Sequence, residues 1–197
     1  MGVRRKSSWV TLLALVLAAA PQLASAAPLT APKEDSPLPD PEVAPRGRHA
    51  PRDIKYSPWR KLCFKAPGKD LLCRTTITGT WDTGQMAIRL DVIGREGSAR
   101  IQILLPVGLY LQAGVKLRLG DNSGDIHLPY SWCFSNLCVA AAPISKAAIA
   151  RLAEARTIAV EVLDTNLVAL EAIIPTDQFE SAQRGPPAET FEQIIDE

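Results

Sequence analysis

Residues 85–105 read QMAIRLDVIGREGSARIQILL, and this stretch decides the fold class. Two runs rich in aliphatic and β-branched residues, Gln85–Ile93 and Ala99–Leu105, have the composition and length of short strands. The turn segment Gly94–Gly97 separates them and supplies glycines that tolerate a positive φ. The stretch therefore predicts a mainly β fold.

The same pattern continues toward the C-terminus. In Val115–Leu119, apolar residues alternate with basic ones, as expected for a half-buried strand. The turn-forming segment Gly120–Gly124 follows it directly. Further along, Thr157–Leu163 and Leu167–Ile174 flank Asp164–Asn166 and predict a β-hairpin.

One helix interrupts the strands, over Ser145–Ala155, because apolar residues recur there at helical spacing. A short helical turn with Phe179 and Ala182 closes the domain. Together these segments predict a single β-sandwich-like domain, or a flattened barrel, with one inserted helix. The sandwich is the preferred form.

The N-terminus has the three parts of a secretory signal peptide. A basic start, Arg4–Lys6, precedes an apolar run from Trp9 to Ala20, and the small residues Ala24–Ala26 follow. The apolar run has about 12 residues, whereas a membrane-spanning helix needs roughly 20. Residues 1–26 are therefore predicted to be cleaved after Ala26, leaving no transmembrane span in the mature chain.

The remaining boundaries follow from composition. Residues 27–55 contain many prolines among charged and small residues and few large apolar side chains, so they predict a disordered, extended linker. The β domain is expected over 56–183. The acidic segment 184–197 contains two prolines and is expected to be a disordered tail.

Removal of the signal peptide changes the charge balance. The full chain has 22 Lys and Arg against 21 Asp and Glu, and residues 1–26 hold three basic and no acidic residues. The mature chain would carry 22 minus 3, or 19, basic residues against 21 acidic ones. A slightly acidic chain argues against nucleic acid or an anionic membrane as a partner, because both require a clustered basic surface.

The chain has four cysteines: Cys63, Cys73, Cys133 and Cys138. In an exported chain they favour disulfides over free thiols. Of the three possible pairings, Cys63–Cys73 with Cys133–Cys138 is preferred, because each pair flanks a plausible turn, Ala66–Lys69 and Phe134–Leu137. A zinc site is disfavoured, since neither spacing is C-x2-C and only two histidines exist. No metal and no cofactor are therefore expected.

The search for catalytic groups is negative. His127 is the one histidine inside the expected domain, it lies in a predicted strand, and no G-x-S-x-G motif accompanies it. The sequence gives no reason for any two carboxylates to converge as a catalytic pair. These scattered acidic residues are Asp82, Asp91, Glu96, Asp121, Asp125, Glu161, Asp164 and Glu171. No catalytic or cofactor-binding residue is predicted, and the protein is expected not to be an enzyme.

Three tryptophans, Trp59, Trp81 and Trp132, lie beside or near cysteines. The favoured interpretation is that their rings pack in the core against the disulfides. The alternative is that exposed rings form a recognition surface.

Several features of the domain occur in a characteristic order: Trp59 before Cys63, then Cys73, the stretch Leu-Pro-x-Gly-Leu-x-Leu-x-x-Gly-Val over Leu105–Val115, the aromatic-flanked Cys133 with Cys138, an alanine-rich helix, and finally Phe179 and Ala182. In this order they resemble the invasion-associated locus B family of bacterial cell-envelope proteins. The resemblance covers about residues 56–183. Two segments, Asp82–Met86 and Pro175–Gln178, lack the glycine-rich sequence that is usual in the family, and the proline-rich linker is additional.

The resemblance implies an exported, non-enzymatic protein in the periplasm or associated with the outer membrane. Founding members of that family are linked to bacterial entry into host cells. The partner that it implies is a protein or another envelope ligand, with host-cell contact among the uses of such binding. The alternatives are a periplasmic enzyme or enzyme inhibitor acting through a surface loop such as Gly120–Gly124, and a purely structural envelope component.

Overall fold

The computed structural model describes residues 43–50, 52–95, 97–120 and 125–192, which belong to one compact unit. The expected signal peptide and the first part of the expected linker, residues 1–42, lie outside the described residues. None of the described helices is both long and apolar enough to cross a membrane.

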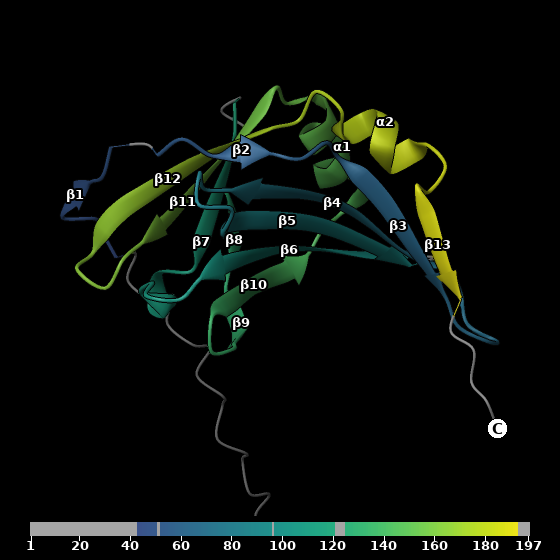
Figure 1. Cartoon of the computed structure of the whole chain (residues 1–197), viewed down its shortest axis with the longest axis horizontal. Helices are drawn as coiled ribbons and strands as arrows, with labels where there is room; N and C mark the ends of the chain where they lie inside the picture. The colour runs from purple at the N-terminus through teal and green to yellow at the C-terminus, as the bar shows by residue number, and fades with distance from the viewer. Residues whose placement is uncertain (1–42, 51, 96, 121–124, 193–197) are drawn as a thin grey trace, which may run out of the picture. The chain divides into compact units, whose positions relative to one another are not determined.

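The described strands form two sheets (Figure 1). The larger is eight-stranded, in the order β13-β3-β4-β5-β6-β10-β9, with β2 paired to β4 beside this path. Its strands are β2 Lys55–Tyr56, β3 Arg60–Lys65, β4 Leu72–Thr80, β5 Met86–Arg95, β6 Ser98–Pro106, β9 Tyr130–Cys133, β10 Leu137–Pro143 and β13 Glu189–Glu192.

The smaller sheet is five-stranded, in the order β1-β12-β11-β7-β8. Its strands are β1 Gly47–Arg48, β7 Val115–Leu119, β8 Ile126–Leu128, β11 Thr157–Leu163 and β12 Val168–Pro175. Within the described residues each sheet is an open series with two edge strands, so the architecture is the preferred sandwich rather than a closed barrel.

The core lies between the sheets. Alternate residues of the central strands point inward, as the period of two requires. The larger sheet contributes fully buried side chains such as Ile77 and Leu90, and the smaller sheet contributes Leu117 and Ile158. The predicted strands over residues 85–105, the strand Val115–Leu119 and the hairpin β11–β12 are thereby confirmed.

Two α-helices close one end of the sandwich, α1 over Lys146–Glu154 and α2 over Phe179–Arg184, and a short 3-10 turn, η1, covers Leu111–Ala113. The hydroxyl of Ser145 caps α1 by accepting a hydrogen bond from the Ala148 N–H at 3.1 Å. Phe179 is buried, and its ring forms a T-shaped contact with Trp59, with the centroids 4.9 Å apart. The predicted helix and the predicted helical turn are both confirmed.

The end of the expected linker is ordered, which corrects the prediction of disorder up to residue 55. β1 pairs in parallel with β12, and β2 pairs with β4. We call residues 47–50 and 52–56 the N-terminal strap, because they run from one sheet to the other. Backbone pairing with an open sheet edge needs few apolar side chains, so composition alone did not indicate it.

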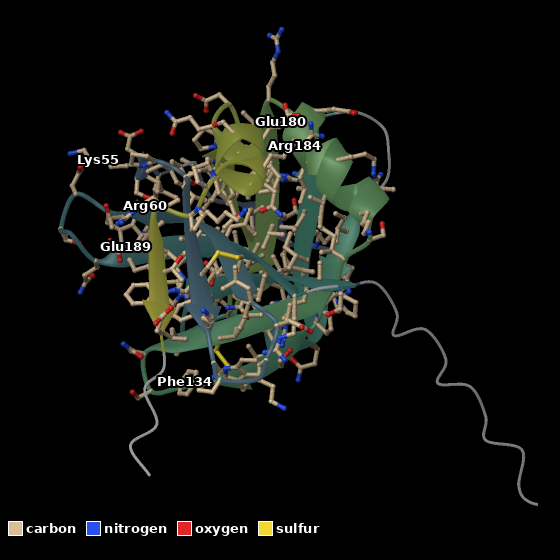
Figure 2. All side chains as sticks on the ribbon, turned by 90° about the vertical axis from the view of Figure 1, so that its right-hand side faces the viewer. Lys55, Arg60, Phe134, Glu180, Arg184 and Glu189 are labelled. Atoms are coloured by element: carbon tan, nitrogen blue, oxygen red, sulfur yellow. A yellow bond between two sulfur atoms is a disulfide. The ribbon has the colours of Figure 1, made fainter. Side chains whose placement is uncertain are left out.

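The expected disordered tail is also partly wrong. β13 lies within it and pairs in parallel with β3. Arg60 donates to Glu189 at 2.9 Å, and Phe191 stacks on Phe64 with ring centroids 5.2 Å apart. Figure 2 shows Arg60 and Glu189 side by side on this face of the molecule. The ordered domain therefore extends to at least residue 192.

Candidate functional site

Both disulfides have the pairing that the sequence favours, Cys63–Cys73 and Cys133–Cys138. Each joins directly opposite residues of neighbouring antiparallel strands, with Cα atoms 4.1 and 4.0 Å apart respectively. The first cross-links β3 to β4, and the second cross-links β9 to β10. Each bridge therefore fixes a hairpin at the margin of the larger sheet.

Asp91 is the one acidic residue that the structure buries completely among the described residues. Its carboxylate accepts hydrogen bonds from Arg89, with the closest contact at 2.9 Å. The Thr76 hydroxyl and the Gln102 amide also donate to it, at 2.5 and 3.0 Å. These partners come from β4, β5 and β6, so the network fixes the centre of the larger sheet and leaves Asp91 no free oxygen for chemistry.

Two further carboxylates do converge, which sequence reasoning missed. Glu161 and Glu171 lie opposite each other on β11 and β12. Arg118 donates to both, at 3.4 and 2.6 Å. Arg48 of the strap binds Glu161 at 2.8 Å. The hydrogen bond from Arg118 to Glu171 raises the pKa of the guanidinium. Because arginines neutralise the pair, we assign it to strand cohesion rather than to acid–base catalysis.

His127 lies on β8, where its exposed ring is hydrogen bonded to the carbonyl of Ala113 at 2.9 Å. In the described residues this is its one hydrogen-bonding partner, so the structure gives it no nucleophile to activate. The loop Gly120–Gly124 of the enzyme alternative lies largely outside the described residues. Among the residues that are described, no cluster of three potential metal ligands occurs.

The tryptophans divide between the two interpretations. Trp59 is buried beside Phe179, and its indole N–H donates to the Pro175 carbonyl at 2.8 Å. Trp132 is 44% exposed, on the edge strand β9. For Trp132 the expectation of a buried ring is therefore wrong, because an edge strand has no neighbour on one side to cover it.

The best candidate site is the segment around this exposed ring, residues 130–139, which we call the aromatic hairpin. Phe134, at its tip, is 59% exposed. The Phe134 N–H donates to the Leu137 carbonyl at 2.7 Å, which closes a tight turn inside the Cys133–Cys138 bridge. Figure 2 shows Phe134 at the lower edge of the molecule, away from the Arg60–Glu189 pair. The hairpin thus presents two large aromatic side chains from a cross-linked backbone.

Neighbouring residues extend this surface. The Arg100 guanidinium lies over the Trp132 ring, 5.8 Å from its centroid, in a cation–π arrangement. Leu111 of η1 is 41% exposed and borders a hollow of about 340 Å³ together with Trp132 and Tyr130. Burial raises the pKa of Tyr130, so its hydroxyl stays protonated at any physiological pH.

A second aromatic cluster contains Phe64 and Phe191, with the Arg74 guanidinium 5.6 Å from the Phe64 centroid. Its rings face each other and hold β13 against β3. This cluster therefore already has an internal partner. In the described residues, neither Trp132 nor Phe134 stacks on another aromatic ring, and Trp132 has the cation–π contact with Arg100. Rigid aromatic anchors beside an arginine are typical of binding hot spots, so this arrangement suits binding to another macromolecule.

Comparison with known proteins identifies a family and a similar solved structure. The family model described as invasion associated locus B (IalB) protein matches residues 59–187. The fold is similar to the crystal structure of invasion associated protein B from Bartonella henselae, with a TM-score of 0.58 and 16% sequence identity, over 66% of this chain and 90% of that one. No curated protein matches the sequence. The β13 strand and the N-terminal strap lie outside the matched residues.

Proposed function

The chain belongs to the invasion associated locus B family, and from this membership we propose that it is an exported, envelope-associated protein that binds a partner protein through the aromatic hairpin. The observation that carries the proposal is the joint exposure of Trp132 and Phe134 on a hairpin that the Cys133–Cys138 disulfide holds. A partner in the envelope is the first expectation, and a host-cell protein is the second.

The physical argument concerns the entropy of binding. A flexible loop loses conformational freedom when it docks, and this loss weakens the complex. The disulfide and the Phe134–Leu137 hydrogen bond already restrict the backbone of the hairpin. Docking would therefore order little more than side chains, and the burial of two aromatic rings would contribute nearly its full free energy.

We also propose that the protein is not an enzyme. This proposal is supported by the partners of the polar groups. Asp91 is paired with Arg89, Arg118 bridges Glu161 and Glu171, and His127 is hydrogen bonded to a carbonyl oxygen. A general acid or base needs a free position beside the reacting group.

The proposed export has a direct test by mass. We expect protein recovered from the envelope fraction to begin at Ala27 and to react with no thiol reagent until it is reduced. After reduction it should take up four equivalents, one for each of its four cysteines. Intact-mass spectrometry with and without reduction measures both. A chain that still begins at Met1, or one that is alkylated without reduction, would contradict export.

The proposed binding has a test by mutation. Replacing Trp132 with serine should weaken capture of the partner from envelope extracts by about thirtyfold or more, because a central aromatic anchor contributes at least 2 kcal/mol. The matched control is Ile173→Ser, which removes a similarly exposed apolar side chain from the other sheet. A partner that is recovered equally with wild type and Trp132→Ser, or no reproducible partner, argues against the hairpin as the binding site.

A further inference from the structure

An apolar cavity of about 260 Å³ lies between the two sheets, at the end where β5 begins and β6 stops. Its walls come from both sheets and from the loop after β6. They include Ile88, Leu105, Leu109, Val160, Val162 and Leu170. Val107, which is exposed, forms part of the opening. The cavity is separate from the aromatic hairpin, since no residue of 130–139 lines it.

The N-terminal strap forms one side of this cavity. Because β1 pairs with the smaller sheet and β2 with the larger one, the strap has one strand in each sheet (Figure 1). Ala50, Arg52 and Ile54 of the strap line the space beneath. Ile54 is fixed beside Gly79, where a Cβ atom would lie 2.5 Å from the Ile54 Cγ2. The glycine therefore allows the strap to approach β4 closely.

The charges at the cavity are unequal. Two charged residues line it, Arg52 and Glu171. Arg118 binds Glu171 at 2.6 Å, so this carboxylate is neutralised. The Arg52 guanidinium lies over the ring of Trp81, 5.6 Å from the centroid, and no carboxylate pairs with it in the described part of the chain. An apolar cavity therefore has a positive charge without an acidic partner at its wall.

We propose that this cavity binds a medium-chain fatty acid, with the acyl chain between the sheets and the carboxylate at Arg52. The apolar walls match an aliphatic chain, and the arginine matches a carboxylate. The volume is larger than the engineered apolar cavity of about 150 Å³ that holds benzene. It therefore has room for more than a single ring but not for a diacyl lipid.

The test uses the whole mature protein and two probes, decanoate and 1-decanol, in isothermal titration calorimetry. Decanoate should bind with one-to-one stoichiometry and more tightly than 1-decanol. Arg52→Gln should weaken the affinity for decanoate about threefold to tenfold and leave the affinity for 1-decanol unchanged, since only the carboxylate interacts with the charge of Arg52. Arg46→Gln is the matched control, because Arg46 directly precedes the strap and does not line the cavity.

A second pair of variants tests the place of the acyl chain. Ala172→Phe fills the cavity and should weaken the binding of both probes at least tenfold. Ile173→Phe adds the same ring on the neighbouring residue, which is exposed, and should change neither. If Ala172→Phe does not fold, Val107→Trp narrows the opening from an exposed position instead.

Three results would contradict the proposal or a part of it. The absence of decanoate binding to the wild type overturns the proposal, and so does unchanged affinity in a folded Ala172→Phe or Val107→Trp. If both probes bind equally and Arg52→Gln has no effect, the proposal that Arg52 binds the carboxylate of the ligand is wrong. None of these results bears on partner capture by the aromatic hairpin, because the two sites share no residue.

Discussion

Asp91→Ala should lower the free energy of unfolding by about 3–5 kcal/mol, the cost of removing one partner from a buried ion pair. The carboxylate is fully buried and accepts hydrogen bonds from Arg89, Thr76 and Gln102. Its removal leaves these donors, from three adjacent strands, without their acceptor. Urea denaturation of the purified protein, followed by circular dichroism, measures the change.

The control for this variant is Asp82→Ala. Asp82 also forms an ion pair, with Lys55 at 2.9 Å, but both side chains are largely exposed. Exposed pairs contribute about 0–1 kcal/mol, so this variant should stay near wild type. If the two variants are destabilised equally, the buried network around Asp91 stabilises the fold no more than an exposed ion pair does.

Gly114→Ala is expected to have the second largest effect, a destabilisation of about 3 kcal/mol or more. Gly114 has φ of 63°, a conformation that other residues adopt at a cost. A Cβ atom there would also lie 2.5 Å from the Nε2 atom of His127 and 2.8 Å from the Leu128 carbonyl oxygen. The backbone oxygen cannot move without disturbing the pairing of β7 with β8.

Gly108→Ala separates the two causes. Gly108 also has a positive φ, 94°, but a Cβ atom at this position would meet nothing within 4 Å. This variant should lose only about 1 kcal/mol, the cost of the backbone conformation. Thermal or urea unfolding of both variants gives the comparison. Equal losses would show that the close approach of His127 to Gly114 costs nothing to relieve.

How far the sequence predicts this fold depends on whether the signal is local. The alternation in Val115–Leu119 and the turn residues of Asp164–Asn166 act over a few positions, and the strands they predict are present. The pairing of Glu161 with Glu171 depends on the register of that hairpin. Leu167, with a φ of 63°, is part of the turn that sets this register, and its conformation is unusual for a leucine.

The parts that were missed depend on distant partners. β1 and β13 are short, polar strands that pair with sheet edges more than a hundred residues away in the chain, so no local pattern marks them. The exposure of Trp132 was the less favoured interpretation for a related reason. Alternation shows that a strand has two faces, but it does not show which residues lack a covering neighbour.

The Asp164 turn shows how the polar groups of the smaller sheet are arranged. The Val168 N–H lowers the pKa of Asp164, and the Asn166 N–H and His49 add to this effect. His49 belongs to the strap, and its ring lies 3.3 Å from the carboxylate. The strap is thus attached to the domain by a side-chain contact as well as by β1.

The parallel pairing of β1 with β12 also has a mechanical consequence. If the chain before Val43 were anchored and the domain pulled, the load would reach the two residues of β1 before any longer strand. β1 would detach first, and the twelve residues from Val43 to Ile54 could extend by roughly 3.3 Å each, about 40 Å in all, while β2 and the sandwich stayed in place. The strap would then act as an extensible reserve that absorbs tension, and its release would uncover the space beneath Arg52.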